Sequence, residues 1–538
     1  MQSTMMQVKL SLNHFLERAG RLFGGVEIVS RMPDKSLHRT NYAAFHRRAR
    51  LLAEALQKAG IRKGDRVGTL MWNHYAHYEA YFGIIASGGV LHTLNLRLAP
   101  DEIGFIANHA EDRIVIVDDI LLPLLEQFRH LTKIEQVIVV PLTGKPVAAP
   151  YIDYEAFLAT ASGDWDYPDH EEDDPVAMCY TSGTTGRPKG VVYSHRSQVL
   201  HSLMLATPDA VGMSGRDVIL PVVPMFHANA WGVPYTAAML GTKVVFPGPH
   251  LHPDDLLPLL ESEKVTLSCG VPTIWLGMIQ ILDRDPGKYR LPSGMRLTVG
   301  GSAVPESLIR GFARHGIDIL QGWGMTETSP LATVSRPNQL QGDLTEDERF
   351  AVQALQGYPL PLVDLRIIGD DGEQPWDGEA VGEIQVHGPW ITGSYHNLPQ
   401  SQDSFTEDGW LRTGDVASVS PIGYVKITDR TKDLIKSGGE WISSVDLENA
   451  IMGHPAVAEA AVIAVPHPKW AERPLAVIVL RQGKSATVDE MKAFLATKFA
   501  KWAVPDAYEF VDAIPRTSTG KFLKTRLREQ YKNWQWPA

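Results

Sequence analysis

Cysteine, net positive charge and long apolar runs are all scarce in this chain of 538 residues. Its two cysteines, Cys179 and Cys269, are too few for a disulfide framework or a zinc cluster. They fit a reducing compartment, so a cytoplasmic protein is expected. The net charge of −11 argues against nonspecific nucleic-acid binding, which needs a cationic surface, and no nucleic-acid partner is expected.

Membrane-directed segments are missing as well. The apolar run 80–91 is shorter than the roughly 18 residues that a membrane-spanning helix needs. Asn13, Glu17 and Arg18 interrupt the apolar residues of the N-terminus, which therefore lacks a secretory pattern. We expect no transmembrane segment and at most peripheral membrane contact.

What the chain does contain is typical of a globular α/β protein. Hydrophobic residues make up 44% and charged residues 21% of it, enough to bury large cores. Short runs rich in β-branched residues alternate with helix-like segments, which predicts layered, buried sheets. The acidic segment 164–175 is predicted to be a solvated connector between subdomains. The expected strands are 65–72, 113–117, 136–140, 217–226, 242–246, 265–271 and 295–299.

The pattern changes near residue 430. Beyond it lie short strands at 461–465 and 475–480, one amphipathic helix at 488–499 and a terminus where basic residues outnumber acidic ones. This is typical of a small α+β domain of common size. The predicted organisation is a large N-terminal domain with several α/β subdomains, residues 1–431, and a small mobile C-terminal α+β domain, residues 432–538.

The most informative stretch is 180–190, Y-T-S-G-T-T-G-R-P-K-G. Glycines let backbone N–H groups approach an anion, and the hydroxyl groups and Lys189 add further donors suited to phosphate. The spacing differs from the G-x-x-x-x-G-K-[ST] loop, so the segment is not that loop. The density of phosphate-binding groups favours phosphate binding over a plain surface loop. The nearby GGSA at 300–303 lacks the last glycine of G-x-S-x-G, which excludes a nucleophile elbow.

Residues 181–190 resemble the phosphate-loop signature of the acyl-adenylate-forming superfamily, which includes acyl-CoA synthetases, adenylation domains of peptide synthetases and luciferases. Further stretches match in the same order over nearly the whole chain. They are 224–231 (PMFHANAW), 322–330 (GWGMTETSP), 413–415 (TGD), 428–432 (TDRTK), 432–446 (KDLIKSGGEWISSVD) and 515–524 (PRTSTGKFLK). Within the superfamily the chain looks most similar to bacterial medium- and long-chain fatty acid–CoA ligases.

The resemblance implies a nucleotide site. Trp323 would pack on adenine, Asp415 would accept hydrogen bonds from the ribose hydroxyls, and Thr184 and Glu327 would hold Mg²⁺, which prefers oxygen ligands. The residues it places at ATP or AMP are Thr181, Ser182, Gly183, Thr184, Thr185, Gly186, Lys189, Gly301, Ser302, Ala303, Gln321, Gly322, Trp323, Gly324, Met325, Thr326, Asp415, Arg430, Lys432, Lys436 and Trp441.

The resemblance also implies catalytic, acyl and hinge residues. Lys521 would stabilise charge on the α-phosphate during attack, and its T-G-K context distinguishes it from the nearby Lys524. Lys432 would be the hinge about which the small domain rotates. The resemblance gives catalytic roles to Lys521, His227 and Glu327. The residues that it places at the acyl group are His227, Ala228, Trp231, Gly301 and Gly324. The loop of the thioester step would be Ser437, Gly438, Gly439 and Glu440.

The predicted function is that of an AMP-forming acyl-CoA ligase using ATP, Mg²⁺ and coenzyme A, and a homodimer is expected. A medium- or long-chain fatty acid is the favoured substrate because of the context of Trp231. Short, sulfur-bearing or aryl acids remain open, as does transfer to a separate carrier protein or an amine. A noncatalytic binding protein that retained the fold is disfavoured, since Lys521 and Glu327 are both present.

Overall fold

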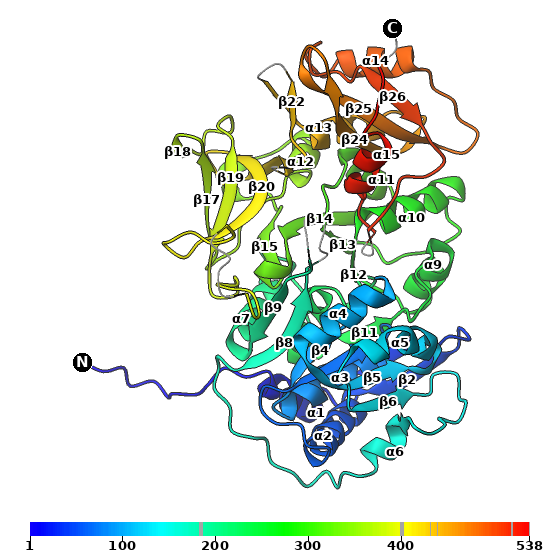
Figure 1. The fold of residues 1–538 in the computed structure, drawn as a ribbon, viewed down its shortest axis with the longest axis vertical. Coiled ribbons are helices and arrows are strands. Elements are labelled where there is room, and N and C mark those ends of the chain that lie inside the picture. The colour runs from blue at the N-terminus through cyan, green and yellow to red at the C-terminus, as the bar shows by residue number, and fades with distance from the viewer. Residues whose placement is uncertain (182–186, 399–402, 431, 438–439, 518–519, 537–538) are drawn as a thin grey trace.

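The computed structural model spans the chain and describes all residues except 182–186, 399–402, 431, 438–439, 518–519, 537–538 and the side chain of Glu440. The described strands form four sheets. In Figure 1 the first four hundred residues form the lower and middle parts of the molecule, and the C-terminal part lies above them.

Two large sheets form the body of the molecule, and neighbouring strands in each are mostly parallel. The first contains, in spatial order, β7 (Ile152–Asp153), β6 (Gln136–Val140), β5 (Asp112–Asp118), β3 (Arg66–Leu70), β4 (Val90–Thr93), β8 (Pro175–Tyr180) and β9 (Gly190–Ser194). The second contains β16 (Tyr358–Pro359), β15 (Leu331–Val334), β14 (Ile317–Gly324), β13 (Met295–Val299), β12 (Leu267–Gly270), β10 (Val218–Pro221), β11 (Lys243–Phe246), β1 (Glu27–Arg31) and β2 (Leu37–Asn41).

Both faces of these sheets are buried, as near-continuous apolar strands require. In β5, Ile114 and Ile116 join one core while Val115 and Val117 join another, because successive side chains point to opposite faces. The core between the sheets contains α1 (Asn13–Phe23), α2 (Tyr42–Lys58), α3 (Tyr75–Ala86), α6 (Tyr154–Leu158), α7 (His195–Ala206) and α8 (Val233–Leu240). The outer layers are α4 (Pro100–Ala110) and α5 (Leu122–Phe128) on one side, and α9 (Pro253–Ser262), α10 (Pro272–Arg284), α11 (Glu306–Ala313) and α12 (Glu346–Gln353) on the other.

A third, antiparallel sheet leads from this body to the C-terminal part. It contains β18 (Gly372–Glu373), β17 (Asp364–Gly369), β19 (Gly382–His387), β20 (Leu411–Val419) and β21 (Val425–Arg430). Its last strand ends at Arg430, and the next strand already belongs to the fourth sheet. The predicted boundary at 431/432 therefore falls on a change of sheet.

The C-terminal part is a small α+β unit with its own cores, which confirms the predicted fold class. The predicted strands 461–465 and 475–480 lie within longer ones, and the predicted helix 488–499 is found as 488–496. Its strands are β22 (Ile435–Ser437), β23 (Glu440–Ile442), β24 (Val457–His467), β25 (Ala471–Leu480) and β26 (Ala507–Phe510), and its helices are α13 (Ser444–Met452), α14 (Val488–Ala496) and α15 (Lys524–Gln530).

Two predictions about local structure need correction. The expected strand 217–226 ends at Pro221, where regular pairing stops: the backbone N–H groups of Val222 and Val223 both donate to Cys269 O. The acidic connector is not simply solvated: Trp165 and Tyr167 are partly buried against the central core, and the Arg50 guanidinium lies 4.9 Å from the Tyr167 ring centre. The run 80–91 forms the end of α3 and the start of β4, and no helix within the described ranges is long and apolar enough to span a membrane.

A buried ion network joins the C-terminal helix to the segment that leaves β21. Lys524 Nζ lies 2.7 Å from Glu448 Oε1 and donates to Ser444 Oγ, which in turn donates to Asp429 Oδ2. The guanidinium of Arg528 pairs with Asp433. Lys524 therefore anchors the C-terminal helix beside the hinge predicted at Lys432. From the sequence alone, Lys524 had been assigned no role beyond being set apart from Lys521.

Lys524→Met should destabilise the protein by about 3 to 5 kcal/mol at pH 8, because it leaves a buried carboxylate unpaired. Burial raises the pKa of Glu448 to about 7, above its usual range, so this group favours the folded state most at low pH and loses that contribution as pH rises through 7. The loss in Lys524→Met should thus be smaller at pH 6 than at pH 8. Urea unfolding at both pH values measures it, and the double variant Lys524→Met/Glu448→Met should recover much of the stability. An equal loss at both pH values would contradict this account.

Candidate active site

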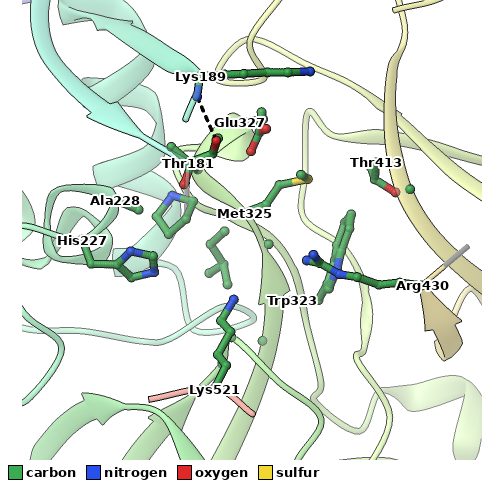
Figure 2. Close-up of a pocket in the computed structure, with 18 of the residues that line it drawn as sticks. Thr181, Lys189, His227, Ala228, Trp323, Met325, Glu327, Thr413, Arg430 and Lys521 are labelled. Atoms are coloured by element: carbon green, nitrogen blue, oxygen red, sulfur yellow. Dashed lines mark hydrogen bonds between the residues drawn. The ribbon is translucent and has the colours of Figure 1, made fainter. Parts of the chain in front are cut away.

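The predicted site residues gather at a cavity of about 500 Å³ where the second sheet, the third sheet and the C-terminal part meet (Figure 2). Its walls include Thr181, Lys189, His227, Ala228, Trp231, Gly301, Gly322, Trp323, Gly324, Met325, Thr326, Glu327, Arg430, Lys432 and Lys521. An adjoining cavity of about 240 Å³ adds Ser302, Ala303, Gln321 and Asp415. Residues more than three hundred positions apart in the sequence thus line one space.

The phosphate-loop segment connects two antiparallel strands, β8 and β9. At its base Thr181 N donates to Lys189 O, and Lys189 N donates to Thr181 Oγ1 over 3.1 Å, the bond drawn in Figure 2. The Lys189 ammonium donates to Ser404 Oγ over 3.2 Å. Ser182, Gly183, Thr184, Thr185 and Gly186 lie outside the described residues, so their predicted contacts with ATP and Mg²⁺ stay predictions.

The predicted ribose carboxylate is held by two neighbours. Asp415 on β20 lies opposite Arg430 on β21, and its Oδ1 is 3.1 Å from Arg430 Nε. Asp415 Oδ2 accepts from the indole nitrogen of Trp323 over 2.8 Å. Antiparallel pairing of β20 and β21 explains why Asp415 and Arg430, fifteen positions apart, lie side by side. The hydrogen bond from Trp323 to Asp415 fixes the plane of the indole ring beside the cavity.

Backbone packing around Trp323 leaves room only for glycine at the next position. A Cβ on Gly324 would lie 1.7 Å from the carbonyl oxygen of Pro330, far inside contact distance. Gln321, three residues earlier, faces away from solvent and accepts from Val304 N over 3.2 Å. The strand end is therefore fixed tightly against both the cavity and the GGSA segment.

The end of the cavity where the sequence predicts the acyl group is built by a left-handed turn that the sequence did not reveal. Ala228, Asn229, Ala230 and Trp231 all have φ between 36° and 57°. Such a conformation costs roughly 1–2 kcal/mol per residue and persists only where the surroundings enforce it. Asn229 provides part of that support, since its amide donates to Thr93 Oγ1 and its backbone N–H to Cys179 Sγ. The turn places the Trp231 ring 3.6 Å from where a Cβ of Gly300 would lie.

His227 and Lys521 face each other across this end of the cavity (Figure 2). Burial, followed by the charges of Lys521 and Arg97, lowers the pKa of His227 to about 3, so the imidazole is neutral at pH 7. Burial, with help from the charge of Arg430, lowers the pKa of Lys521 to about 8. The Lys521 chain passes Gly301 so closely that a Cβ there would lie 3.1 Å from Lys521 Cε.

Glu327 is a buried carboxylate, 5% exposed, that lines the cavity. Burial raises its pKa, while a 2.7 Å hydrogen bond from the hydroxyl of Tyr395 opposes that rise. No ammonium or guanidinium in the described part of the chain lies within ion-pair distance of it. A buried carboxylate oxygen without a cationic partner fits a hard divalent cation such as Mg²⁺.

The structure does not bring every predicted residue into the cavity. Lys436 and Trp441 lie on the β22–β23 hairpin, where the Lys436 ammonium sits 5.2 Å from the exposed Trp441 ring. Ser437 is buried and accepts from Arg473 over 3.0 Å. Gly438, Gly439 and the Glu440 side chain are outside the described part. The expected roles of this loop therefore stay predictions.

Sequence reasoning missed several residues that line the cavity. Tyr395, Ser404 and Arg412 come from the third sheet and its connections, and Thr298 lies near the end of β13. None of these residues lies in a sequence pattern that indicates a function. A tyrosine in a loop or a threonine in an apolar strand is common in proteins whether or not it lines a site. Only the pairing of distant strands brings them to the site.

Comparison with known proteins identifies the family. The model of the AMP-binding enzyme family matches residues 17–396, and that of the AMP-binding enzyme C-terminal domain matches 446–521. The long-chain-fatty-acid–CoA ligase of Thermus thermophilus is 51% identical, over 99% of this chain and 97% of its own. The 3-methylmercaptopropionyl-CoA ligase of Ruegeria pomeroyi is 45% identical, over 99% of both chains. The crystal structure of the anthranilate CoA ligase AuaEII with anthranoyl-AMP superposes with a TM-score of 0.87 at 25% identity, covering 98% of this chain and 99% of that one.

The chain belongs to the AMP-binding enzyme family. Within it, the chain is an AMP-forming acid–thiol ligase that makes acyl-CoA.

Trp323→Phe should weaken AMP binding about tenfold, because it removes the indole N–H that orients the Asp415 carboxylate, a hydrogen bond to a charged group. Isothermal titration calorimetry with AMP measures it. Trp165→Phe is the matched control, since it removes an indole hydrogen bond to Gln57 far from the cavity. The assignment of Asp415 to the nucleotide is wrong if both variants bind AMP as the parent protein does.

Proposed function

We propose that this ligase activates a medium- or long-chain fatty acid in two steps. A carboxylate oxygen attacks the α-phosphorus of ATP, and pyrophosphate leaves to give the acyl-adenylate. The thiolate of coenzyme A then attacks the acyl carbonyl carbon, and AMP leaves. Activation as a mixed anhydride converts a poor leaving group into a good one, which makes two easy steps from one difficult step.

The observation that carries the first step is the meeting of Lys521 with the nucleotide residues in one cavity. Lys521 would stabilise the negative charge that builds on the phosphoryl oxygens, and its position fits attack beside the neutral His227. Asp415 and Arg430 would hold the ribose and phosphates, and Lys189 the outer phosphates. Mg²⁺, bound by Glu327 and Thr184, would neutralise phosphate charge.

The second step requires another arrangement of the C-terminal part. Rotation about Lys432 would withdraw Lys521 and bring the loop of Ser437, Gly438, Gly439 and Glu440, with Lys436 and Trp441, to the acyl-adenylate. The change of sheet after Arg430 supports a hinge there. We further propose that residues 1–431 and 432–538 are the two moving bodies, that the enzyme is a homodimer, and that it acts in the cytoplasm.

The nature of the acid rests on the acyl end of the cavity. The Trp231 ring and the apolar residues Ala228, Val299 and Leu331 support a hydrocarbon chain. One observation favours a second candidate: the Thr298 hydroxyl lines this end, is buried, and has no hydrogen-bond partner among the described residues. An acid with a thioether, hydroxyl or oxo group near its carboxylate would pair with that hydroxyl, which a plain chain leaves unsatisfied.

Lys521→Ala should lower acid-dependent ATP–pyrophosphate exchange about a hundredfold or more, because a positioned charge is lost from the transition state. Lys521 loses its charge as pH rises through about 8, so kcat/KM for ATP in the parent enzyme should fall above that pH. Lys521→Arg should shift or remove this alkaline limb. If Lys521→Ala catalyses ATP–pyrophosphate exchange at the parent rate, the catalytic role assigned to Lys521 is wrong.

An acid panel from acetate to palmitate, with 3-methylthio- and 3-hydroxy-acids included, separates the two acyl candidates. CoA-dependent AMP release should be greatest with chains of about eight carbons or more. Thr298→Val should change kcat/KM for unsubstituted fatty acids by no more than about twofold. If the second candidate holds, the same variant should lower kcat/KM for the polar acids about tenfold. Absence of any thioester with every acid would disprove the ligase proposal.

A further inference from the structure

One tyrosine contacts both ends of the proposed metal and phosphate site. Tyr395 is 7% exposed and lies in the segment after β19. Its hydroxyl donates to Glu327 Oε1 over 2.7 Å. The Lys189 ammonium lies 4.6 Å from the centre of its ring. Neither the motifs nor their spacing had pointed to this residue.

Hydrogen bonds fix the segment around Tyr395 both to the segment of Glu327 and to strand β9. Thr392 N donates to the carbonyl oxygen of Glu327 over 2.8 Å, and Ser329 Oγ donates to Trp390 O over 2.8 Å. On the other side, His396 N donates to Gly190 O over 2.9 Å, at the start of β9. These bonds fix Tyr395 relative to Glu327 and to the strand that follows Lys189.

The position of Tyr395 separates two opposite charges. Among the described residues no ion pair joins the Lys189 ammonium to the Glu327 carboxylate: the ammonium donates to Ser404 Oγ and lies over the Tyr395 ring. If they met directly, each charge would neutralise the other and neither would be free for a ligand. The hydroxyl satisfies one carboxylate oxygen, and the electron-rich ring face attracts the ammonium, so both keep their charge.

We propose that Tyr395 is a positioning residue of the adenylation site: its hydroxyl orients the Glu327 carboxylate for a divalent cation, and its ring keeps Lys189 apart from that carboxylate and available to the phosphates of ATP. The proposal rests on the proposed function. It assigns two separable effects to one side chain, because the hydroxyl and the ring can be removed in turn.

Tyr395→Phe keeps the ring and removes the hydroxyl. It should weaken binding of ATP in the presence of Mg²⁺ about tenfold, the size of effect expected when a group that orients a metal ligand is lost. Binding of ATP in EDTA should stay within about twofold, because Lys189 keeps its ring contact. Tyr395→Leu removes both parts and should weaken binding several-fold in EDTA as well. Calorimetric titration with ATP, with Mg²⁺ and with EDTA, measures all four affinities without any turnover.

Two further variants make the test specific. Tyr154→Phe removes another buried tyrosine–glutamate hydrogen bond, 2.9 Å from Tyr154 to Glu79 and outside both cavities, and should leave all ATP affinities unchanged. Glu327→Gln should abolish the gain in ATP affinity that Mg²⁺ gives, and Tyr395→Phe should have no further effect in that background.

Several outcomes would overturn the proposal. The first is Tyr395→Phe binding ATP with Mg²⁺ as tightly as the parent does. The second is Tyr395→Phe losing equal affinity with Mg²⁺ and with EDTA, and the third is Glu327→Gln keeping the Mg²⁺-dependent gain. Failure of the proposed function is distinguishable from these, since a parent enzyme that binds ATP with Mg²⁺ but shows no acid-dependent exchange would refute only the acid-activating role.

Discussion

The site depends on keeping several charges buried close together while only some of them pair directly. Asp415 pairs with Arg430, while Lys521, Glu327 and Lys189 line the same cavity without mutual ion pairs. Burial lowers the pKa of Lys521 and raises that of Glu327, so both charged forms carry a desolvation cost. A highly charged ligand such as ATP would offset this cost.

Rigid backbone around the cavity makes that arrangement possible. The left-handed turn from Ala228 to Trp231 and the close approach of Gly324 to Pro330 are unfavourable or impossible for most sequences. The surrounding core enforces them, since Trp231 and Met325 pack against the largest hydrophobic cluster, which also includes Trp323. Large α/β layers thus serve chemistry by fixing strand ends that carry the functional side chains.

The proposed rotation of the C-terminal part places a contrasting demand on the structure. Its buried Lys524–Glu448 pair stabilises it as a body. Polar bonds also join helix α13 to strand β21, since Ser444 donates to Asp429 and Lys426 pairs with Asp446. A body with its own cores is suited to the proposed change of position as a unit.

The sequence by itself determined the α/β class, the family and most residues of the cavity. Each of the motifs that carry them can be recognised from adjacent residues alone; these are 181–190, 322–330, 413–415 and the T-G-K segment. It misjudged the connector at Trp165, since burial of an acidic loop depends on what packs on it. Tertiary structure alone decided that Asp415 faces Arg430, that Lys524 is buried, and that Tyr395 lies between Glu327 and Lys189. Those facts follow from strand register and from contacts between segments tens to hundreds of residues apart, which no local pattern encodes.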